Sequence, residues 1–335
     1  MYIVSSYSLA VGLTFITMLC WGSWGNTQKL AAKTWRYELF YWDYVIGVLL
    51  LSVLMGFTLG SSGSNGRSFI PDLMQVSAAN FGSAFLGGII FNASNILLSA
   101  SISLAGMAVA FPVGVGLALV LGVIINYVGA PSGDPLILFS GVALIVVALL
   151  LNGNAYSRMK QGGDKSAARK GLWIAIAAGI LMSFFYRFVA AAVDLENFES
   201  PTPGMATPYT AVFIFTLGML FSNFFFNTLV MKKPFAGAPV TYKDYFAGKL
   251  STHAVGILGG LIWGIGTSLS YLATEKAGAA ISYALGQGAT MVAAFWGVFI
   301  WKEFKGASKT VNNLILLMFV LFIAGLALII LAGNS

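Results

Sequence analysis

Ten segments of this chain are long and apolar enough to cross a lipid bilayer, and this feature limits the fold more than any other. A membrane-spanning helix needs about 20 mostly apolar residues. The segments occupy residues 5–28, 37–59, 79–101, 104–128, 135–153, 171–192, 208–231, 253–274, 277–301 and 310–332. The 335 residues are 58% hydrophobic and 9% charged, whereas a water-soluble domain carries about 25% charged residues. The sequence therefore predicts an all-α integral membrane protein with a single transmembrane domain over residues 1–335.

The linkers between the segments differ in basic residues from one side of the membrane to the other. Fifteen Lys and Arg residues lie on one side, namely Lys29, Lys33, Arg36, Arg158, Lys160, Lys165, Arg169, Lys170, Lys232, Lys233, Lys243, Lys249, Lys302, Lys305 and Lys309. The other side has Arg67 and Lys276, and Arg187 lies within a segment. Because positively charged loops stay in the cytoplasm, we predict a multi-pass protein of the cell (inner) membrane with a cytoplasmic central loop and both termini outside. The N-terminus lacks the basic start of a signal peptide, so we expect it to be retained.

One stretch of the chain occurs twice. Residues 86–116 read LGGIIFNASNILLSASISLAGMAVAFPVGVG, and residues 258–288, which lie 172 positions later, read LGGLIWGIGTSLSYLATEKAGAAISYALGQG. Five segments separate the copies, so the second enters the membrane in the opposite direction. We predict an inverted repeat of two five-helix units, 5–153 and 171–332, which is a plan of secondary transporters. The alternative is that helices rich in Gly, Ala and Leu align easily.

The aligned copies agree at glycine and apolar positions and differ mostly at polar ones. Phe91 aligns with Trp263, and Val115 aligns with Gln287. A symmetric scaffold can alternate between two forms, while unlike polar groups hold a solute in one orientation. In the fourth segment, Pro112 marks a weak point, which is either an ordinary proline kink or a hinge.

Stripes of polar and aromatic side chains on these helices predict a cavity at mid-membrane between the halves, because polar groups in hydrocarbon usually face the bundle interior. The candidate substrate-binding residues are Trp21, Trp24, Asn92, Asn95, Trp263, Thr267, Tyr271 and Gln287. Aromatic rings combined with amides favour a small, neutral, polar solute. The alternatives are an organic cation held by cation–π contacts and simple hydrogen bonding between neighbouring helices.

Two charged residues lie within the apolar segments. A carboxylate such as that of Asp43 costs about 2.5–3.5 kcal/mol at the membrane centre, and apolar surroundings favour its protonated form. We therefore predict that Asp43 couples transport to protons. Arg187, toward the outer end of the sixth segment, is a candidate partner for Asp43, for Asp194 or for a substrate oxygen. Alternatively, Arg187 extends to the membrane interface.

The sequence lacks the motifs of an enzyme or of a metal or nucleotide site. A single Cys20 and a single His253 exclude a thiolate cluster and a His-ligated metal centre. The sequence GGDKS at 162–166 departs from a phosphate-binding loop, because Asp164 interrupts the Gly-Lys pair and no strand precedes it. We expect no catalytic residues, cofactor or metal. The basic residues lie in the linkers, so we expect no nucleic-acid partner.

Four stretches resemble a known group of carriers. They are CWGSWGNTQKL (20–30), KGLWIAIAAGILMSFFYRFVAAA (170–192), TPYTAVFIFTLG (207–218) and ISYALGQGATMVAAFWGVFIWKEF (281–304). With these stretches the chain resembles the drug/metabolite transporter superfamily, in particular the ureide permease family, and more distantly the bacterial glucose/ribose and rhamnose porters. The resemblance implies a proton-driven importer of a small neutral polar solute. The nucleotide-binding-like motif of plant ureide permeases has no match in the central loop.

Four functions follow from these observations. The first is a proton symporter that imports a sugar by alternating access. The second is the same machine with a ureide or a nucleobase derivative as its solute. The third is a drug or metabolite exporter, and the fourth is an integral-membrane enzyme, against which the missing catalytic set argues. The sequence leaves the solute, the direction, the coupling ion and the oligomeric state open.

Overall fold

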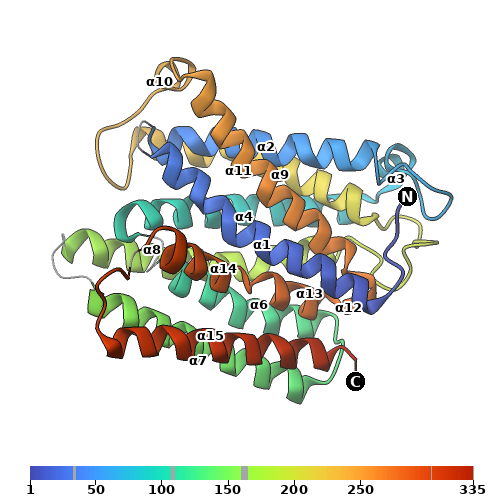
Figure 1. The fold of residues 1–335 in the computed structure, drawn as a ribbon. Helices are drawn as coiled ribbons and strands as arrows, with labels where there is room; N and C mark the ends of the chain where they lie inside the picture. Colours follow the sequence, from blue (N-terminus) through green and yellow to red (C-terminus); the bar gives the residue numbers. More distant parts are fainter. Residues whose placement is uncertain (33–34, 107–109, 160–164, 303, 335) are drawn as a thin grey trace.

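The computed structural model describes residues 1–32, 35–106, 110–159, 165–302 and 304–334, and this part of the chain is helical (Figure 1). The helices are α1 (Tyr7–Ala31), α2 (Tyr37–Phe57), α3 (Phe69–Gln75), α4 (Ala78–Ala105), η1 (Phe111–Val115), α6 (Gly116–Gly129), α7 (Pro135–Met159), α8 (Lys165–Ala190), α9 (Pro208–Lys232), α10 (Tyr242–Phe246), α11 (Leu250–Leu272), α12 (Thr274–Ala277), α13 (Ala279–Gly286), α14 (Ala289–Phe295), η2 (Trp296–Ile300) and α15 (Lys309–Ala332). Within the described residues, 10 helical spans are long and apolar enough to cross a membrane. The predicted all-α membrane fold is confirmed.

The two ends of the helical bundle differ in what they carry. The N- and C-termini and α3 lie at one end, which we call the terminal end (Figure 1). The last turns of α1, α7 and α9 and the first turns of α2, α8 and α11 lie at the opposite end, which we call the loop end. Residues 160–164, which include Gly163 and Asp164, fall outside the described part of the chain. The sidedness of the two ends stays a prediction from the charge distribution.

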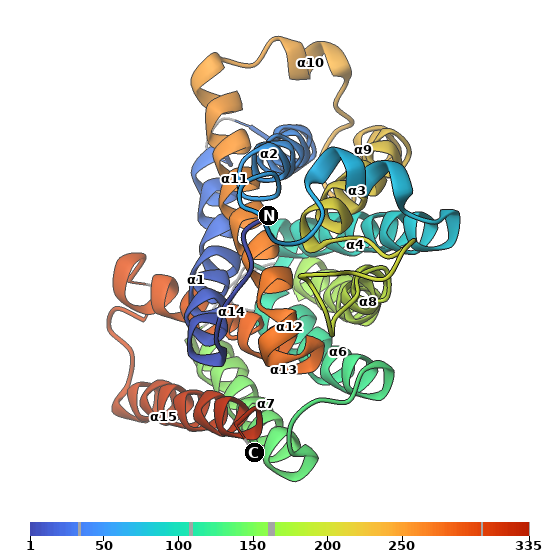
Figure 2. The same cartoon turned by 90° about the vertical axis from the view of Figure 1, so that its right-hand side faces the viewer.

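The helices pack in pairs that correspond between the two halves. α1 packs against α11 as α8 packs against α4, and α2 packs against α11 as α9 packs against α4. α7 and α15 pack against each other at the edge of the bundle (Figure 2). Exchange of the two halves converts each pair into its counterpart. This correspondence is what an inverted repeat requires, and it supports the repeat as a prediction.

Two glycines at equivalent repeat positions directly follow α4 and α12 and have the same backbone shape. Gly106 has φ 83° and ψ 161°, and Gly278 has φ 76° and ψ 156°. Their amides donate to Ile102 O at 2.9 Å and to Thr274 O at 2.7 Å. A positive φ favours glycine because it has no Cβ. This explains why glycine stands at both positions of the tight helical hairpins.

The fourth and ninth spans are irregular near equivalent positions. Pro112 lies in the π-helical turn η1, which passes into α6 at Gly116. In the ninth span α13 ends at Gly286 and α14 begins at Ala289. Proline and small residues loosen the helical ladder at such points. Both irregular turns adjoin the cavity described below.

Close helix contacts depend on glycines in two corresponding pairs. A Cβ on Gly260 of α11 would lie 2.0 Å from Tyr44 O of α2. A Cβ on Gly88 of α4 would lie 2.0 Å from Phe215 O of α9. Small residues let transmembrane helices approach to backbone contact. These contacts fix the positions of the helices that carry the candidate site.

Candidate functional site

A cavity lies between helices of the two halves. It is lined by Trp21, Trp24, Phe91, Asn95, Leu98, Phe111, Val115, Met182, Phe185, Trp263, Gln287 and Ala289. The volume of the cavity is about 30 Å³. That is room for about two waters, so a larger solute requires the lining helices to separate.

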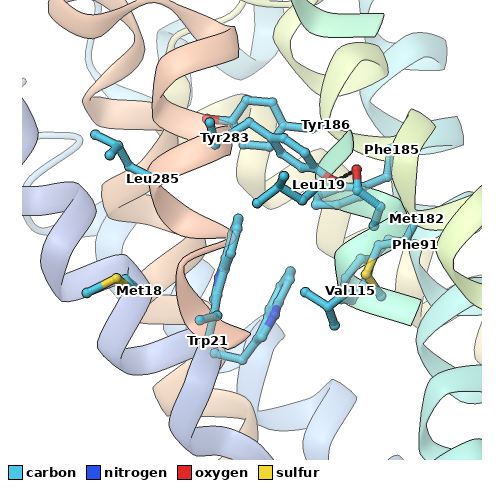
Figure 3. Packing of buried hydrophobic residues seen from close by; sticks show 14 of the residues in the cluster. Met18, Trp21, Phe91, Val115, Leu119, Met182, Phe185, Tyr186, Tyr283 and Leu285 are labelled. Atoms are coloured by element: carbon cyan, nitrogen blue, oxygen red, sulfur yellow. Dashed lines mark hydrogen bonds between the residues drawn. The ribbon is translucent and has the colours of Figure 1, made fainter. Parts of the chain in front are cut away.

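The sequence had placed eight residues at a central site, and the structure brings five of them to this cavity. They are Trp21, Trp24, Asn95, Trp263 and Gln287. Figure 3 shows Trp21, Phe91, Val115 and Met182 around a common space. The lining comes from α1, α4, η1, α8, α11 and the irregular ninth span, so both halves contribute.

The rings of the cavity form a stack. The Trp263 ring lies 4.3 Å from the Phe91 ring between centroids, with an interplanar angle of 28°. It is also nearly parallel to the Trp21 ring, at 6.0 Å and 11°. Thr267 fixes this arrangement, because its Oγ1 accepts from Trp21 Nε1 at 3.1 Å and donates to Trp263 O at 3.1 Å. Thr267 therefore supports the ring stack of the cavity.

Two amides supply the polar part of the lining. Asn95 is 1% exposed, and its Nδ2 has no hydrogen-bond partner among the described residues. Gln287 lies in the break between α13 and α14. A buried amide without a partner costs about 1–3 kcal/mol. Asn95 and Gln287 can therefore bind the polar edge of a solute that lies against the rings.

The other three predicted residues do not line the cavity: Thr267 supports the ring stack, and Asn92 and Tyr271 contact other helices. Asn92 Nδ2 donates to Ser222 Oγ of α9 at 2.9 Å. Tyr271 stacks on Tyr186 of α8 with centroids 4.3 Å apart, and its hydroxyl donates to Tyr186 O at 3.4 Å. Helical spacing placed both on the stripes that face the cavity, but α9 and α8 cover these positions. The structure gives them contacts between helices.

Asp43 lies near the loop end in a buried group of polar and aromatic side chains. It is 1% exposed. His253 Nδ1 of α11 lies 3.0 Å from both of its carboxylate oxygens, and the Tyr245 hydroxyl of α10 donates to Asp43 Oδ1 at 2.6 Å. Gly256 makes room for this contact, since a Cβ there would lie 2.5 Å from Asp43 Cβ. The carboxylate thus ties α2 to α10 and α11.

The ring of Trp35 covers this group. It lies 4.5 Å from the His253 ring and 5.8 Å from the Tyr245 ring. Burial, together with the hydrogen bond to Asp43, raises the pKa of Tyr245. The phenol therefore stays protonated and acts as a donor to the carboxylate. Sequence reasoning missed His253 and Tyr245 as partners of Asp43. The feature that could have indicated His253 is its place near the start of a span, as Asp43 is near the start of another.

Arg187 and Asp43 are not brought together. Arg187 lies in the last turn of α8 at the terminal end, where a Cβ on Gly129 would meet its Nε at 2.1 Å. Asp43 lies near the loop end and pairs with His253. Asp194 accepts hydrogen bonds from the Thr202 amide and hydroxyl, at 2.8 and 2.7 Å. In the part of the chain that the structure describes, no three His, Cys, Asp or Glu side chains gather as a metal site.

Comparison with known proteins places the chain in a family. The profile of the family described as Ureide permease matches residues 40–168 and 159–332. Ureide permease 4 of Arabidopsis thaliana is 22% identical over 397 residues, which cover 98% of this chain and 98% of that protein. Ureide permease 1 of the same plant is 23% identical, again over 98% of each chain.

Two further similarities also cover most of the chain. The Putative ribose uptake protein RbsU of Latilactobacillus sakei subsp. sakei (strain 23K) is 23% identical over 86% of this chain and 85% of that protein. A protein of known crystal structure shares the fold with a TM-score of 0.56 and 16% identity, over 95% of this chain and 97% of that one. Because the family profile covers most of the sequence, this multi-pass membrane protein belongs to the ureide permease family.

Proposed function

We propose that this protein is a secondary transporter that imports a small, neutral ureide by alternating access. The observation that carries the proposal is the cavity, in which stacked rings and two amides come from both halves and in which none of the described lining residues is charged. Flat ureido groups stack on aromatic faces and exchange hydrogen bonds with amides. The relatives named ureide permeases support this solute class, and they favour it over the sugar that the sequence had suggested first.

Coupling to protons is part of the proposal and is assigned to Asp43. Its charged form is held by His253 and Tyr245, which belong to other helices. Protonation of the carboxylate would weaken its contacts with His253 and Tyr245, and so would loosen α2 from α10 and α11. A proton gradient could thereby drive the change between the two forms. Membership of the wider drug/metabolite transporter superfamily belongs to the same proposal.

Counterflow in proteoliposomes tests the transport function. Vesicles loaded with unlabelled allantoin, a ureide, should accumulate external labelled allantoin, and the label should be recovered unmodified. An acidic exterior should drive allantoin inward against its gradient. Recovery of a converted product would instead indicate an enzyme, and outward movement under the same gradient would indicate an exporter.

Ribose is the second candidate solute, since one relative is named a ribose uptake protein. The apolar faces of a sugar also pack on indole rings, and its hydroxyls bind amides. Competition separates the two classes. An excess of unlabelled allantoin should abolish allantoin counterflow, while the same excess of ribose should leave it unchanged. The reverse pattern, with ribose as the better competitor, would assign the cavity to sugars.

A further inference from the structure

A second group of buried polar side chains lies between the cavity and the loop end. It consists of Gln28 of α1, Tyr37, Tyr41 and Tyr44 of α2, Asn95 and Ser99 of α4, and Asn223 and Asn227 of α9, and we call it the polar column. Each member is at most 8% exposed. Asn95 belongs both to the column and to the cavity lining.

The column begins at the ring stack of the cavity. Tyr44 packs against Trp24 with centroids 4.9 Å apart and against Trp263 at 6.2 Å. Tyr41 follows, with its ring 5.3 Å from that of Tyr44. The first part of the column is therefore continuous with the cavity.

From there the column continues to the loop end. Gln28 Nε2 donates to Ser99 O at 3.3 Å, which joins α1 to α4. Asn227 Nδ2 donates to Glu38 O at 2.9 Å, which joins α9 to the first turn of α2. Since α1, α4 and α9 all end at the loop end, these contacts lie between the cavity and that end. The column thus extends from the cavity toward the loop end, and its side chains come from four helices.

The members of the column share an unusual property. Each has a side-chain polar atom without a hydrogen-bond partner among the described residues: Gln28 Oε1, the hydroxyls of Tyr37, Tyr41 and Tyr44, Asn95 Nδ2, Ser99 Oγ, both atoms of Asn223, and Asn227 Oδ1. Buried polar groups are normally paired, and each unpaired one costs about 1–3 kcal/mol. These unpaired atoms therefore indicate hydrogen-bond partners that are present only part of the time.

Three tyrosines on the terminal side of the cavity, by contrast, have paired hydroxyls. The Tyr186 hydroxyl lies 2.9 Å from Ser270 Oγ, and Tyr271 stacks on Tyr186. The Tyr283 hydroxyl donates to Ala118 O at 3.0 Å. These three tyrosines, which we call the tyrosine seal, are fully buried and their hydroxyls are paired. The chain thus has satisfied tyrosines on one side of the cavity and unsatisfied ones on the other.

We propose that the polar column is the path along which solute moves between the cavity and the loop end, and that the tyrosine seal closes the terminal side in this conformation. The inference rests on the proposed transport function, which it deepens. When the helices around the column separate, its hydroxyls and amides become hydrated and offer successive hydrogen bonds to a neutral solute. The same groups disfavour an apolar solute, because they would be left unpaired beside it.

Cysteine accessibility tests the path in the protein as a whole. In a Cys20→Ser background, Ser99→Cys is compared with Ser101→Cys, which is also fully buried but bonds to Gly171 O at 2.8 Å and lies nearer to the loop end. The protein is placed in lipid nanodiscs, and a charged methanethiosulfonate reagent is added from water. Ser99→Cys should react at least tenfold faster than Ser101→Cys. This ratio corresponds to a difference of about 1.4 kcal/mol in the free energy of exposing the thiol to water.

A second matched pair guards against a variant that does not fold. Asn223→Cys replaces a column member with no described partner, and Ser222→Cys replaces its neighbour, whose hydroxyl donates to Gly218 O at 2.7 Å. Asn223→Cys should again be the faster of the two, while Ser270→Cys at the tyrosine seal should react as slowly as Ser101→Cys. Equal rates within both pairs, or a faster reaction at Ser270→Cys, would overturn the path.

The labelling experiment and the transport assay test separate claims, and either can fail without the other. If the column cysteines react selectively but neither allantoin nor ribose exchanges, the path stands and the proposed solute is wrong. If allantoin exchanges normally while the column cysteines stay as slow as their controls, the transport function stands and the path lies elsewhere.

Discussion

Phe91 and Trp263 occupy the same position in the two copies of the repeated sequence, and their rings stack on each other at 4.3 Å between centroids. Residues related in this way meet only where the two halves face each other. Val115 and Gln287, a second equivalent pair, line the same cavity. The cavity therefore lies where the halves meet, and a solute held there contacts helices from both. This geometry is the basis of the predictions about solute binding.

Gln287→Ala should weaken solute binding without loss of folding. The amide lines the cavity, so its removal deletes a bond to the solute and leaves the helix packing intact. A solute group left unpaired costs about 1–3 kcal/mol, which predicts a Kd about ten- to a hundredfold higher. The measurement is allantoin binding to purified protein, with Tm on the same preparation. An unchanged Kd would remove Gln287 from the site.

Asn92→Ala should give the opposite pattern, which makes it a control for Gln287→Ala. Asn92 bonds to Ser222 of α9 and does not line the cavity. Its loss should lower Tm, because a buried hydrogen bond between α4 and α9 contributes about 0.5–1.5 kcal/mol, while the Kd for allantoin should stay the same. A large loss of affinity at unchanged Tm would return Asn92 to the binding site.

Asp43→Asn should abolish concentrative uptake while sparing exchange. The amide keeps the shape of the side chain but can neither carry the charge nor take up the proton. Proteoliposomes with an acidic exterior should then equilibrate allantoin without accumulating it, and counterflow should continue. Accumulation with the normal pH dependence would show that coupling does not run through Asp43.

Tyr245→Phe should move the pH midpoint of uptake upward. The phenol donates to Asp43 at 2.6 Å and so favours the carboxylate over the protonated acid. Without this donor, and with His253 as the remaining partner, a lower proton concentration suffices to protonate the acid. Uptake rates measured from acid to neutral pH give the midpoint. Tyr242→Phe, a neighbouring ring of α10 whose hydroxyl contacts Thr228, is the control and should leave the midpoint unchanged.

Gly278→Ala should destabilise the protein more than Gly106→Ala. Both positions combine a positive φ with ψ near 160°, a region almost restricted to glycine, where another residue costs about 1–3 kcal/mol. At Gly278 a Cβ would also lie 2.5 Å from Ser132, whereas nothing lies within 4 Å at Gly106. Gly12→Ala, in open space within α1, should cause no loss and serves as the control. Tm in detergent ranks the three, and an equal fall for Gly106→Ala and Gly278→Ala would contradict the contact with Ser132.

The orientation predicted from the basic linkers can be checked with reporters. A reporter fused after Ser335 should be periplasmic in a bacterial host, and one inserted near Gly163 should be cytoplasmic. Both positions lie outside the described residues, so the prediction rests on charge alone. The inverse result would place the loop end, and with it the polar column, on the outer side.

The sequence alone determined the membrane class and the ten spans, because a helix must satisfy its backbone in hydrocarbon and needs a fixed length to cross it. The repeated sequence also aligned Gly106 with Gly278, and the structure gives both residues the same backbone conformation. Five of the eight predicted site residues line the cavity, because helical spacing was enough to place them on the correct side of their helices. Helical spacing puts Trp21 and Trp24 on one side of α1, whatever the neighbouring helices are.

Only the tertiary structure decided which of several polar residues on one stripe meets the cavity. Asn92 and Asn95 lie one turn apart, yet α9 covers the first and the cavity exposes the second. The partners of Asp43 were likewise beyond the sequence, because Tyr245 and His253 lie about 200 positions away. The rotation and depth of each helix depend on contacts such as that of Gly260 with Tyr44 O, between spans far apart in the chain. Local periodicity carries no information about such contacts.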